Sequence, residues 1–468
     1  MFWLELIVVL GMLLVGARVG GIFLGMSSGV SLAVLIFGFG CTPGKPPIDV
    51  VMIIMAVVVT VSVLQASGGM DYLIQVAIRM LRSNPKRISI YAPLISWLFT
   101  FMCGTGYIAY GILPVIAEVS REAGVRPERP ISISVIASQQ AITACPISAA
   151  TVALLGFLAP ANISLIDILL VCVPATLIGV LAGALYASRM GAELAEDPAY
   201  LARVAAGDAA PIHEKTDFQE KTFGHREKTA VVLYILATVM VVAFGIFPEL
   251  RPTYLVGDHM TMLPMTMTIE IVMMIMAGVI LLAAKVDVYS VIEQSVFKQG
   301  LMGVYCVFGL AWAGDTLVEN NLAFLQGCAQ DIVMAHPWVF ALVLFFLSSL
   351  ILSQAGTLGA LAPLGLSLGI SAPMMIGIFP AVSGLFFIPS YATVLAGIAF
   401  DRTGTTCIGK YVFNHSFMLP GLITCTVSVA IGLGACRHAS VRFLGIRSVK
   451  AKKESSSWGD SFFGVKIR

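Results

Sequence analysis

Long apolar segments separated by short polar loops dominate this chain. In the first half they cover residues 4–20, 22–40, 48–68, 90–103, 107–120, 131–158 and 164–188. Most are long enough to cross a bilayer as an α-helix, which takes about 20 apolar residues. A shorter piece at 71–82 places its apolar residues at helical spacing and predicts an amphipathic helix.

The second half repeats this order. Its apolar segments cover residues 229–247, 264–284, 296–316, 337–370, 373–399 and 416–436, with a polar-edged piece at 317–331. Each half contains one short interruption, Gly104-Thr105-Gly106 in the first and Ser353-Gln354-Ala355-Gly356-Thr357 in the second. Because so short a gap suits a tight turn better than two full crossings, we expect a re-entrant helical hairpin at each place.

Proline interrupts one further apolar segment in each half. Segment 131–158 contains TACPIS around Pro146, and segment 373–399 contains IPSYAT around Pro389. Proline lacks a backbone donor and clashes with the preceding turn, so a helix is expected to break there. A break inside a membrane needs protein or a wet cavity around it. Interrupted segments at matching places in two halves point to the binding site of a transporter.

This order predicts an all-α polytopic membrane protein built from two inverted repeats. Each repeat would hold about five transmembrane helices, a re-entrant hairpin and a broken helix. The expected parts are a first transmembrane repeat over 1–188, a cytoplasmic inter-repeat linker over 189–228, a second transmembrane repeat over 229–436 and a basic C-terminal tail over 437–468. The alternative is a series of unrelated spans.

Composition supports the membrane class. Of 468 residues, 58% are hydrophobic and 12% are charged, whereas a soluble domain has about 25% charged residues. The nine cysteines occur singly, so we interpret them as small buried side chains. A net charge of +2, with the basic residues in loops, gives no sign of nucleic-acid binding. The chain has no HExxH, Walker or GxSxG motif, so we expect a non-enzyme without a cofactor or metal site.

Lysines and arginines in the loops predict the orientation in the lipid bilayer. Most of them, including Arg79, Arg126 and Arg402, fall on one face, while Lys45 and Arg251 fall on the other. The positive-inside rule makes the first face cytoplasmic and places both termini outside. The basic tail conflicts with this assignment, because positive charge opposes translocation.

Polar residues within the apolar segments gather in four places, the two interruptions and the two proline breaks. Helix N-termini there offer unpaired N–H groups and about half a positive charge each, which favours carboxylates. None of the four contains Lys or Arg, and paired clusters suit a dicarboxylate. The expected substrate-binding residues are Gly104, Thr105, Gly106, Thr143, Cys145, Pro146, Ser148, Ser353, Gln354, Thr357, Pro389, Ser390 and Thr393. The plainer interpretation is that the hydroxyls bond only to neighbouring helices.

Two further residues are candidates for gating or regulation. Asp401 and Arg402 follow the second broken segment on the predicted cytoplasmic face, where we expect a gate or a loop anchor. We also expect the Cys145 thiol, next to the proline break, to meet water in the cavity.

Several ordered stretches resemble the anaerobic C4-dicarboxylate transporters, the Dcu family. They extend to about Gly434 and include GTGYIAYGILPVIAEV, SQQAITACPISAA, AWAGDT, SQAGT, PAVSGLFFIPSYAT and FDRTGTTCIGKYVFNHSFMLPG. The resemblance implies an inner-membrane exchanger of fumarate, malate, aspartate and succinate that serves anaerobic fumarate respiration or aspartate uptake. It also implies a membrane sensor kinase as a partner of some members, with Asp401 at an acidic position tied to that role. Whether the chain forms a homo-oligomer stays open.

Two residues depart from the family pattern. Tyr107 follows Gly-Thr-Gly where the family has Asn, and Cys145 replaces the serine before the proline. Both changes remove a small polar contact from the expected site. They permit an alternative function, a transport-impaired membrane co-sensor of a dicarboxylate-responsive sensor kinase. A channel or structural membrane protein is disfavoured by the paired broken helices.

Overall fold

The computed structural model describes residues 1–19, 22–83, 85–106, 108–161, 163–212, 222–256, 259–328, 336–389, 391–409 and 414–436. Within these residues, the helical stretches long and apolar enough to cross a membrane are Ile48–Ala66, Glu128–Ala161, Leu165–Ala187, His225–Ile246, Met265–Ala283, Ser295–Asn321 and Met418–Cys436. Shorter apolar helices accompany them. The chain is an all-α polytopic membrane protein, as its sequence predicts. Tyr107, Ser390 and the tail 437–468 lie outside the described residues.

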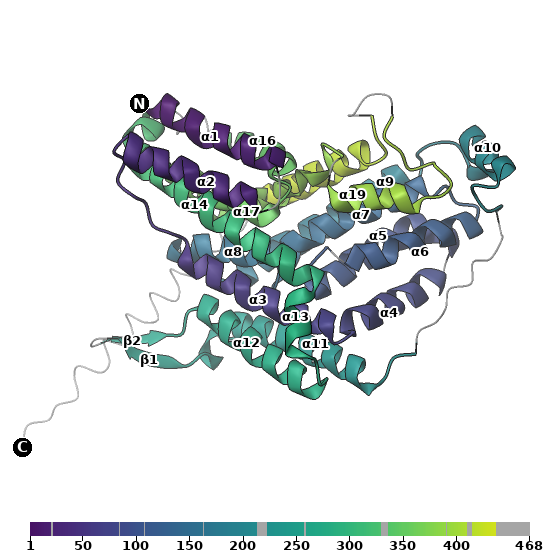
Figure 1. Ribbon diagram of the computed structural model, residues 1–468, viewed down its shortest axis with the longest axis horizontal. Helices are drawn as coiled ribbons and strands as arrows, with labels where there is room; N and C mark the ends of the chain where they lie inside the picture. Colours follow the sequence, from purple (N-terminus) through teal and green to yellow (C-terminus); the bar gives the residue numbers. More distant parts are fainter. Residues whose placement is uncertain are drawn as a thin grey trace, which may run out of the picture.

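The helices fall into two sequential sets. The first contains α1 (Phe2–Val19), α2 (Phe23–Ala33), α3 (Ile48–Ala66), α4 (Gly69–Ser83), α5 (Ile88–Cys103), α6 (Ile108–Glu122), α7 (Glu128–Ala144), α8 (Ala149–Leu158) and α9 (Leu165–Ala187). The second contains α11 (His225–Ile246), α12 (Met265–Ala283), α13 (Val288–Glu293), α14 (Ser295–Cys328), α16 (Pro337–Ile351), α17 (Gln354–Ser367), α18 (Ala372–Ile378), α19 (Ala392–Phe400) and the final helix Met418–Cys436. Figure 1 shows α1, α2 and α14 together on one side and α4, α5 and α6 on the other.

The membrane explains why strand-favouring residues form helices here. α3 is rich in Val and Ile, which favour strands in water. Inside a bilayer each backbone N–H and C=O group must find a partner, and a helix supplies these partners from its own backbone. α4 differs because it is amphipathic, and it buries Met70, Leu73, Ala77 and Leu81. This helix confirms the prediction at 71–82.

Both expected helical hairpins are present. α5 packs on α6, and α16 packs on α17. The first helix of each hairpin ends in a residue of left-handed conformation, Gly104 (φ 68°) or Leu352 (φ 55°). The N–H groups of these two residues bond back to the carbonyls of Thr100 and Ser348. The two tips therefore turn in the same way, while the inverted repeat itself stays a prediction.

Both expected helix breaks are also present. α7 ends at Ala144 and α8 begins at Ala149, with extended backbone at Cys145 (ψ 128°) and Ser148 (ψ 148°). In the second half, α18 leads into the 3-10 helix η6 (Phe379–Phe386), and α19 begins at Ala392. The chain thus interrupts its helices on both sides of Pro146 and Pro389, for the reason that proline predicts.

Three features differ from the sequence expectation. The linker region contains α10 (Pro198–Ala206), which Asp197 caps and Gly207 (φ 81°) terminates, and α11 begins inside the expected linker, at His225. The polar-edged piece at 317–331 is not separate, because α14 continues to Cys328 through a kink at Asn321 (φ −123°). The expected span 22–40 is α2 extended by the π-helical turn Val34–Gly38.

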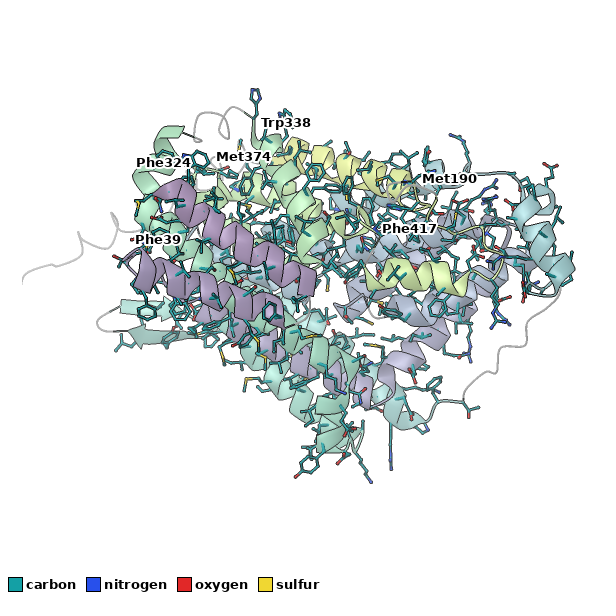
Figure 2. The ribbon with its side chains drawn as sticks, turned by 45° about the horizontal axis from the view of Figure 1, so that its top comes forward. Phe39, Met190, Phe324, Trp338, Met374 and Phe417 are labelled. Atoms are coloured by element: carbon teal, nitrogen blue, oxygen red, sulfur yellow. The ribbon has the colours of Figure 1, made fainter. Side chains whose placement is uncertain are left out.

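The two ends of the molecule carry different structures. Near one end, a hairpin of β1 (Thr253–Val256) and β2 (His259–Met262) pairs Thr253 with Met262, which the apolar pattern did not predict. Figure 2 shows Phe39 and Phe324 towards this end and Met190 towards the other. In Figure 1, α10 lies at the far end from the β-hairpin.

Close contact between α9 and the final helix depends on glycine. Gly179 and Gly183 lie one turn apart, the spacing of small-residue contacts between membrane helices. A Cβ atom at Gly183 would overlap the Thr424 hydroxyl and lie 2.6 Å from Ile133 Cδ1. Any larger residue must therefore displace the Thr424 and Ile133 side chains or push α9 away from its neighbours.

Gly183→Val is expected to lower the thermal unfolding temperature of the purified protein. Overpacking a tight contact costs about 1–3 kcal/mol. The matched control is Gly278→Val in α12, where a Cβ atom meets nothing within 4 Å. Equal unfolding temperatures for the two variants would contradict the packing of α9 on the final helix.

Candidate functional site

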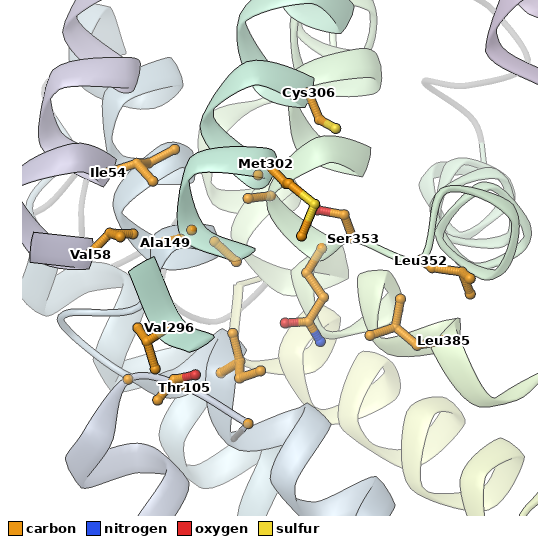
Figure 3. Close-up of a pocket in the computed structure, with 18 of the residues that line it drawn as sticks. Ile54, Val58, Thr105, Ala149, Val296, Met302, Cys306, Leu352, Ser353 and Leu385 are labelled. Atoms are coloured by element: carbon orange, nitrogen blue, oxygen red, sulfur yellow. The ribbon is translucent and has the colours of Figure 1, made fainter. Parts of the chain in front are cut away.

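One cavity of about 340 Å³ brings together parts of three of the four predicted polar clusters and residues that flank the fourth, the break at 143–148. Gly104, Thr105 and Gly106 line it from the first hairpin tip, and Ser353, Gln354 and Ala355 line it from the second. Ala149 and Ala150 reach it from the start of α8, and Tyr391, Ala392 and Thr393 from the start of α19. Figure 3 shows Thr105, Ala149 and Ser353 around the same space. The volume is within the usual range of small-molecule sites.

The cavity wall carries no formal charge among the described residues. Its polar side chains are Thr105, Tyr110, Ser353, Gln354, Tyr391 and Thr393, and no Lys, Arg, Asp, Glu or His lines it. Apolar side chains of α3 and α14, such as Ile54, Val58 and Met302, form the opposite wall. Because α8, α17 and α19 all begin at this wall, the first N–H groups of three helices lie around it. Such a surface attracts an anion by dipoles and neutral donors.

The first hairpin tip is held from several directions. The Tyr234 hydroxyl of α11 donates to the Cys103 carbonyl at 2.9 Å, directly before the tip. Thr100 and Ser138 share a hydroxyl hydrogen bond of 2.8 Å between α5 and α7. A Cβ atom at Gly104 would lie 3.0 Å from the Ile147 carbonyl oxygen, so the tip touches the break before α8.

The second hairpin tip is anchored by its own polar side chains. Ser353 caps α17, because its hydroxyl accepts from the Gly356 N–H at 3.1 Å. The Gln354 amide nitrogen donates to the Gln139 carbonyl and to the Ser383 hydroxyl, each at 2.9 Å. These two bonds tie the tip to α7 and to η6. The Thr357 hydroxyl donates to the Ser353 carbonyl at 2.7 Å and does not line the cavity.

The first break is built from predicted site residues that do not line the cavity. Ser148 accepts from the Thr151 N–H at 3.1 Å and donates to the Ile142 carbonyl at 2.6 Å. Thr143 donates to the Gln140 carbonyl at 2.8 Å. Cys145 is fully buried in this conformation and lies beside the backbone N–H groups of Gly104, Ile147 and Ser148. Together with Pro146, these side chains shape the break and satisfy its backbone.

The predicted substrate-binding residues fall into two groups, those that line the cavity and those that do not. Gly104, Thr105, Gly106, Ser353, Gln354 and Thr393 line the cavity, whereas Thr143, Cys145, Pro146, Ser148, Thr357 and Pro389 do not. Sequence reasoning missed Tyr110, Tyr391 and the α14 residues Gly300, Gly303 and Cys306. Tyr391 lies inside the motif IPSYAT, and Gly300 and Gly303 interrupt an apolar span, so the sequence contained a signal for both. The sequence contains no such signal for Tyr110, because a single tyrosine in an apolar helix is common.

Asp401 and Arg402 lie away from this cavity, beside a second one of about 480 Å³ that residues 207–211 also line. The buried Asp401 carboxylate accepts from the N–H groups of Thr403 and Thr406 at 2.9 and 2.7 Å, and from the Thr405 hydroxyl at 2.8 Å. The Arg402 carbonyl accepts from Arg203 at 3.1 Å. Asp401 therefore holds the loop after α19 together, and the Arg402 carbonyl joins that loop to the linker. A gating or regulatory role for the two residues stays a prediction.

Ion pairs hold the linker at the same end. Arg126 pairs with Glu128 at 2.6 Å and also with Asp197, and Arg129 pairs with Glu193 at 3.0 Å. Burial alone would raise the pKa of Asp197, but the Tyr200 N–H and the Arg126 guanidinium outweigh it and hold the pKa of that carboxyl below its usual range. Arg126 and Arg129, two of the basic residues that the charge pattern placed on one face, therefore both lie against the linker.

Comparison with known proteins identifies the family. The family model described as "Anaerobic c4-dicarboxylate membrane transporter" matches residues 1–438. The chain belongs to this family. It is thus a multi-pass inner-membrane transporter and not an enzyme.

The chain also resembles individual members of the family along almost its entire length. It is 39% identical to the C4-dicarboxylate transporter DcuA of Wolinella succinogenes over 92% of this chain and 97% of that protein. It is 39% identical to DcuA of Escherichia coli K12, with 92% and 98% covered. The anaerobic C4-dicarboxylate transporter DcuB of Escherichia coli O6:H1 is 36% identical, with the same coverage.

A solved structure supports the fold of this family member. It is that of MtrF from Neisseria gonorrhoeae, described as one of a class of antimetabolite efflux pumps. The TM-score is 0.51 over 81% of this chain and 80% of that one, at 11% identity. At this identity the likeness concerns the fold alone.

Tyr234→Phe is expected to loosen the first hairpin tip. Loss of one hydrogen bond of about 1 kcal/mol corresponds to roughly fivefold faster local opening. Hydrogen–deuterium exchange of residues 100–106 in the reconstituted protein measures it. The control is Tyr200→Phe, which removes a hydroxyl bonded at the same 2.9 Å to the Ala210 carbonyl in the linker. Unchanged exchange at 100–106 in Tyr234→Phe would refute this role.

Proposed function

We propose that this transporter exchanges C4-dicarboxylates, namely fumarate, malate, aspartate and succinate, across the inner membrane by alternating access. Such exchange serves anaerobic fumarate respiration. The observation that carries the proposal is the uncharged cavity at which helices from both halves of the chain begin. The names of the relatives, all C4-dicarboxylate transporters, supply the size of the ligand.

The cavity suits a dianion with separated charges. One carboxylate lies at the first hairpin tip, where Thr105 and the start of α8 offer donors. The other lies at the second tip, near Ser353 and the starts of α17 and α19. Figure 3 shows Thr105 and Ser353 on different sides of the space. Six of the predicted residues take part by shaping the breaks and tips, without lining the cavity, namely Thr143, Cys145, Pro146, Ser148, Thr357 and Pro389. A binding role for Ser390 stays a prediction.

The same electrostatics favour exchange over net flux. When the cavity is empty, helix N-termini face it without an anion, and an unsatisfied buried donor costs about 1–3 kcal/mol. Interconversion of the two access states therefore proceeds best with a dianion bound. The apolar wall of α3 and α14 can slide past the hairpin tips without breaking charged contacts, because no charged side chain among the described residues lines that wall.

Vesicle uptake tests the proposed exchange. Reconstituted protein is expected to take up labelled fumarate quickly into vesicles loaded with succinate and slowly into empty vesicles. Labelled monocarboxylates serve as the control, because they offer one charge to a two-carboxylate site. Equal uptake by loaded and empty vesicles would refute exchange, and accumulation of monocarboxylates as readily as fumarate would refute the two-carboxylate site.

The co-sensor alternative gives a separate result in this assay. A chain that binds fumarate but moves none of it would fit a transport-impaired co-sensor of a sensor kinase. The altered positions Tyr107 and Cys145 motivate that alternative. A sensor kinase partner and a homo-oligomer both stay predictions.

Thr393→Val is expected to raise the KM for fumarate about tenfold or more. The Thr393 hydroxyl lines the cavity and has no hydrogen-bond partner among the described residues, and a bond to an anion is worth about 1.5–3 kcal/mol. The matched control is Thr357→Val, because its hydroxyl bonds within α17. A KM change of similar size in both variants would show that helix packing, and not ligand contact, is responsible.

A further inference from the structure

Gln354 presents a hydrogen-bond acceptor whose orientation is set by its neighbours. Its amide nitrogen donates to the Gln139 carbonyl oxygen and to the Ser383 hydroxyl, each at 2.9 Å. Rotating the amide by half a turn would place its oxygen against the Gln139 carbonyl oxygen, which repels it. The nitrogen therefore faces Gln139, and the amide oxygen Oε1 faces the other way.

This oxygen has no hydrogen-bond partner among the described residues. Gln354 is only 5% exposed and is one of the residues that line the cavity. Leaving a buried acceptor without a donor is costly, since the group has lost its water. A donor on a bound ligand would remove that cost.

The chemistry of the surrounding wall shows what kind of donor fits. The hydroxyls of Thr105, Ser353 and Thr393 and the helix N-termini can all donate to carboxylates. The Gln354 oxygen can only accept, and it belongs to a residue that lines the same cavity at the second tip. A ligand that matches the wall carries two carboxylates and one N–H or O–H donor between them.

We propose that Gln354 Oε1 accepts a hydrogen bond from the substituent on C2 of the dicarboxylate. Gln354 thereby selects 2-amino and 2-hydroxy dicarboxylates, such as aspartate and malate, over unsubstituted succinate. This inference rests on the proposed function. Because the amide is held by α7 and η6 at once, the acceptor is placed in advance and need not reorganise on binding.

The first test uses the unaltered protein and a matched pair of ligands. Malate and 2-methylsuccinate have nearly the same shape, but only malate offers a donor at C2. In competition with labelled fumarate, malate is expected to bind about tenfold tighter or more, because a site built around a polar substituent rejects its apolar analogue. Equal competition by the two ligands would overturn the proposal.

The second test uses Gln354→Met, which keeps the length of the side chain and removes the acceptor. The aspartate-to-succinate and malate-to-methylsuccinate affinity ratios are each expected to fall about tenfold or more, whatever happens to the overall rate. The control is Ser383→Ala, which removes one partner of the Gln354 nitrogen but leaves the oxygen. It is expected to keep both ratios within about threefold. An equal loss of affinity for all ligands in Gln354→Met would assign the residue a structural role only.

These outcomes separate the inference from the proposed function. If the unaltered protein transports none of the dicarboxylates, the proposed function fails. If it transports them but Gln354→Met leaves both affinity ratios unchanged, only the proposed Gln354 subsite is wrong. A further outcome concerns acidic pH in the unaltered protein. If succinate gains affinity there and the preference for malate is lost, the hydrogen-bond donor is a protonated carboxyl group of the ligand. That result would also overturn the proposal.

Discussion

The structure depends on one constraint, that backbone N–H and C=O groups in an apolar bilayer must find partners. Four interruptions break the helices inside this protein, and the two hairpin tips and the break before α8 are repaired locally. Ser148 and Ser353 cap the helices that follow their interruptions, and Gly104 and Leu352 turn the chain in the left-handed conformation. The repairs leave helix N-termini at a common cavity. The site is therefore a consequence of how the breaks are satisfied.

An uncharged site has advantages for a carrier of dianions. A lysine or arginine in the cavity would hold a carboxylate strongly and would need its own partner when the ligand leaves. Helix dipoles and hydroxyls attract the anion less strongly. This suits transport, because a transport pathway works only if its binding sites also release the ligand. The Gln354 amide adds selectivity to such a site at no cost in charge. Its two anchors, Gln139 and Ser383, belong to the helices next to the two breaks.

Charged residues of this protein do their structural work at the ends of the helices. Arg126, Arg129 and Asp197 join the loop before α7 to the linker. Asp401 gathers the N–H groups and hydroxyls of the loop after α19 into one buried turn. The second broken helix thus leads from the cavity directly to the linker side. A partner that binds this loop could therefore change the position of α19, whose first residues line the cavity.

The membrane class, the hairpins, the breaks and the family were all predictable from the amino-acid sequence, because these depend on local properties. Apolar length predicts a span, proline predicts a break, and short motifs such as IPSYAT carry the resemblance. The tertiary structure decided which polar residues face the cavity. Ser148 and Thr143 look as suitable as Thr393 in the sequence, yet their hydroxyls turn back to the carbonyls of Ile142 and Gln140. The sequence pattern cannot reveal that choice, since it depends on the direction of each side chain at a break, which the folded backbone sets.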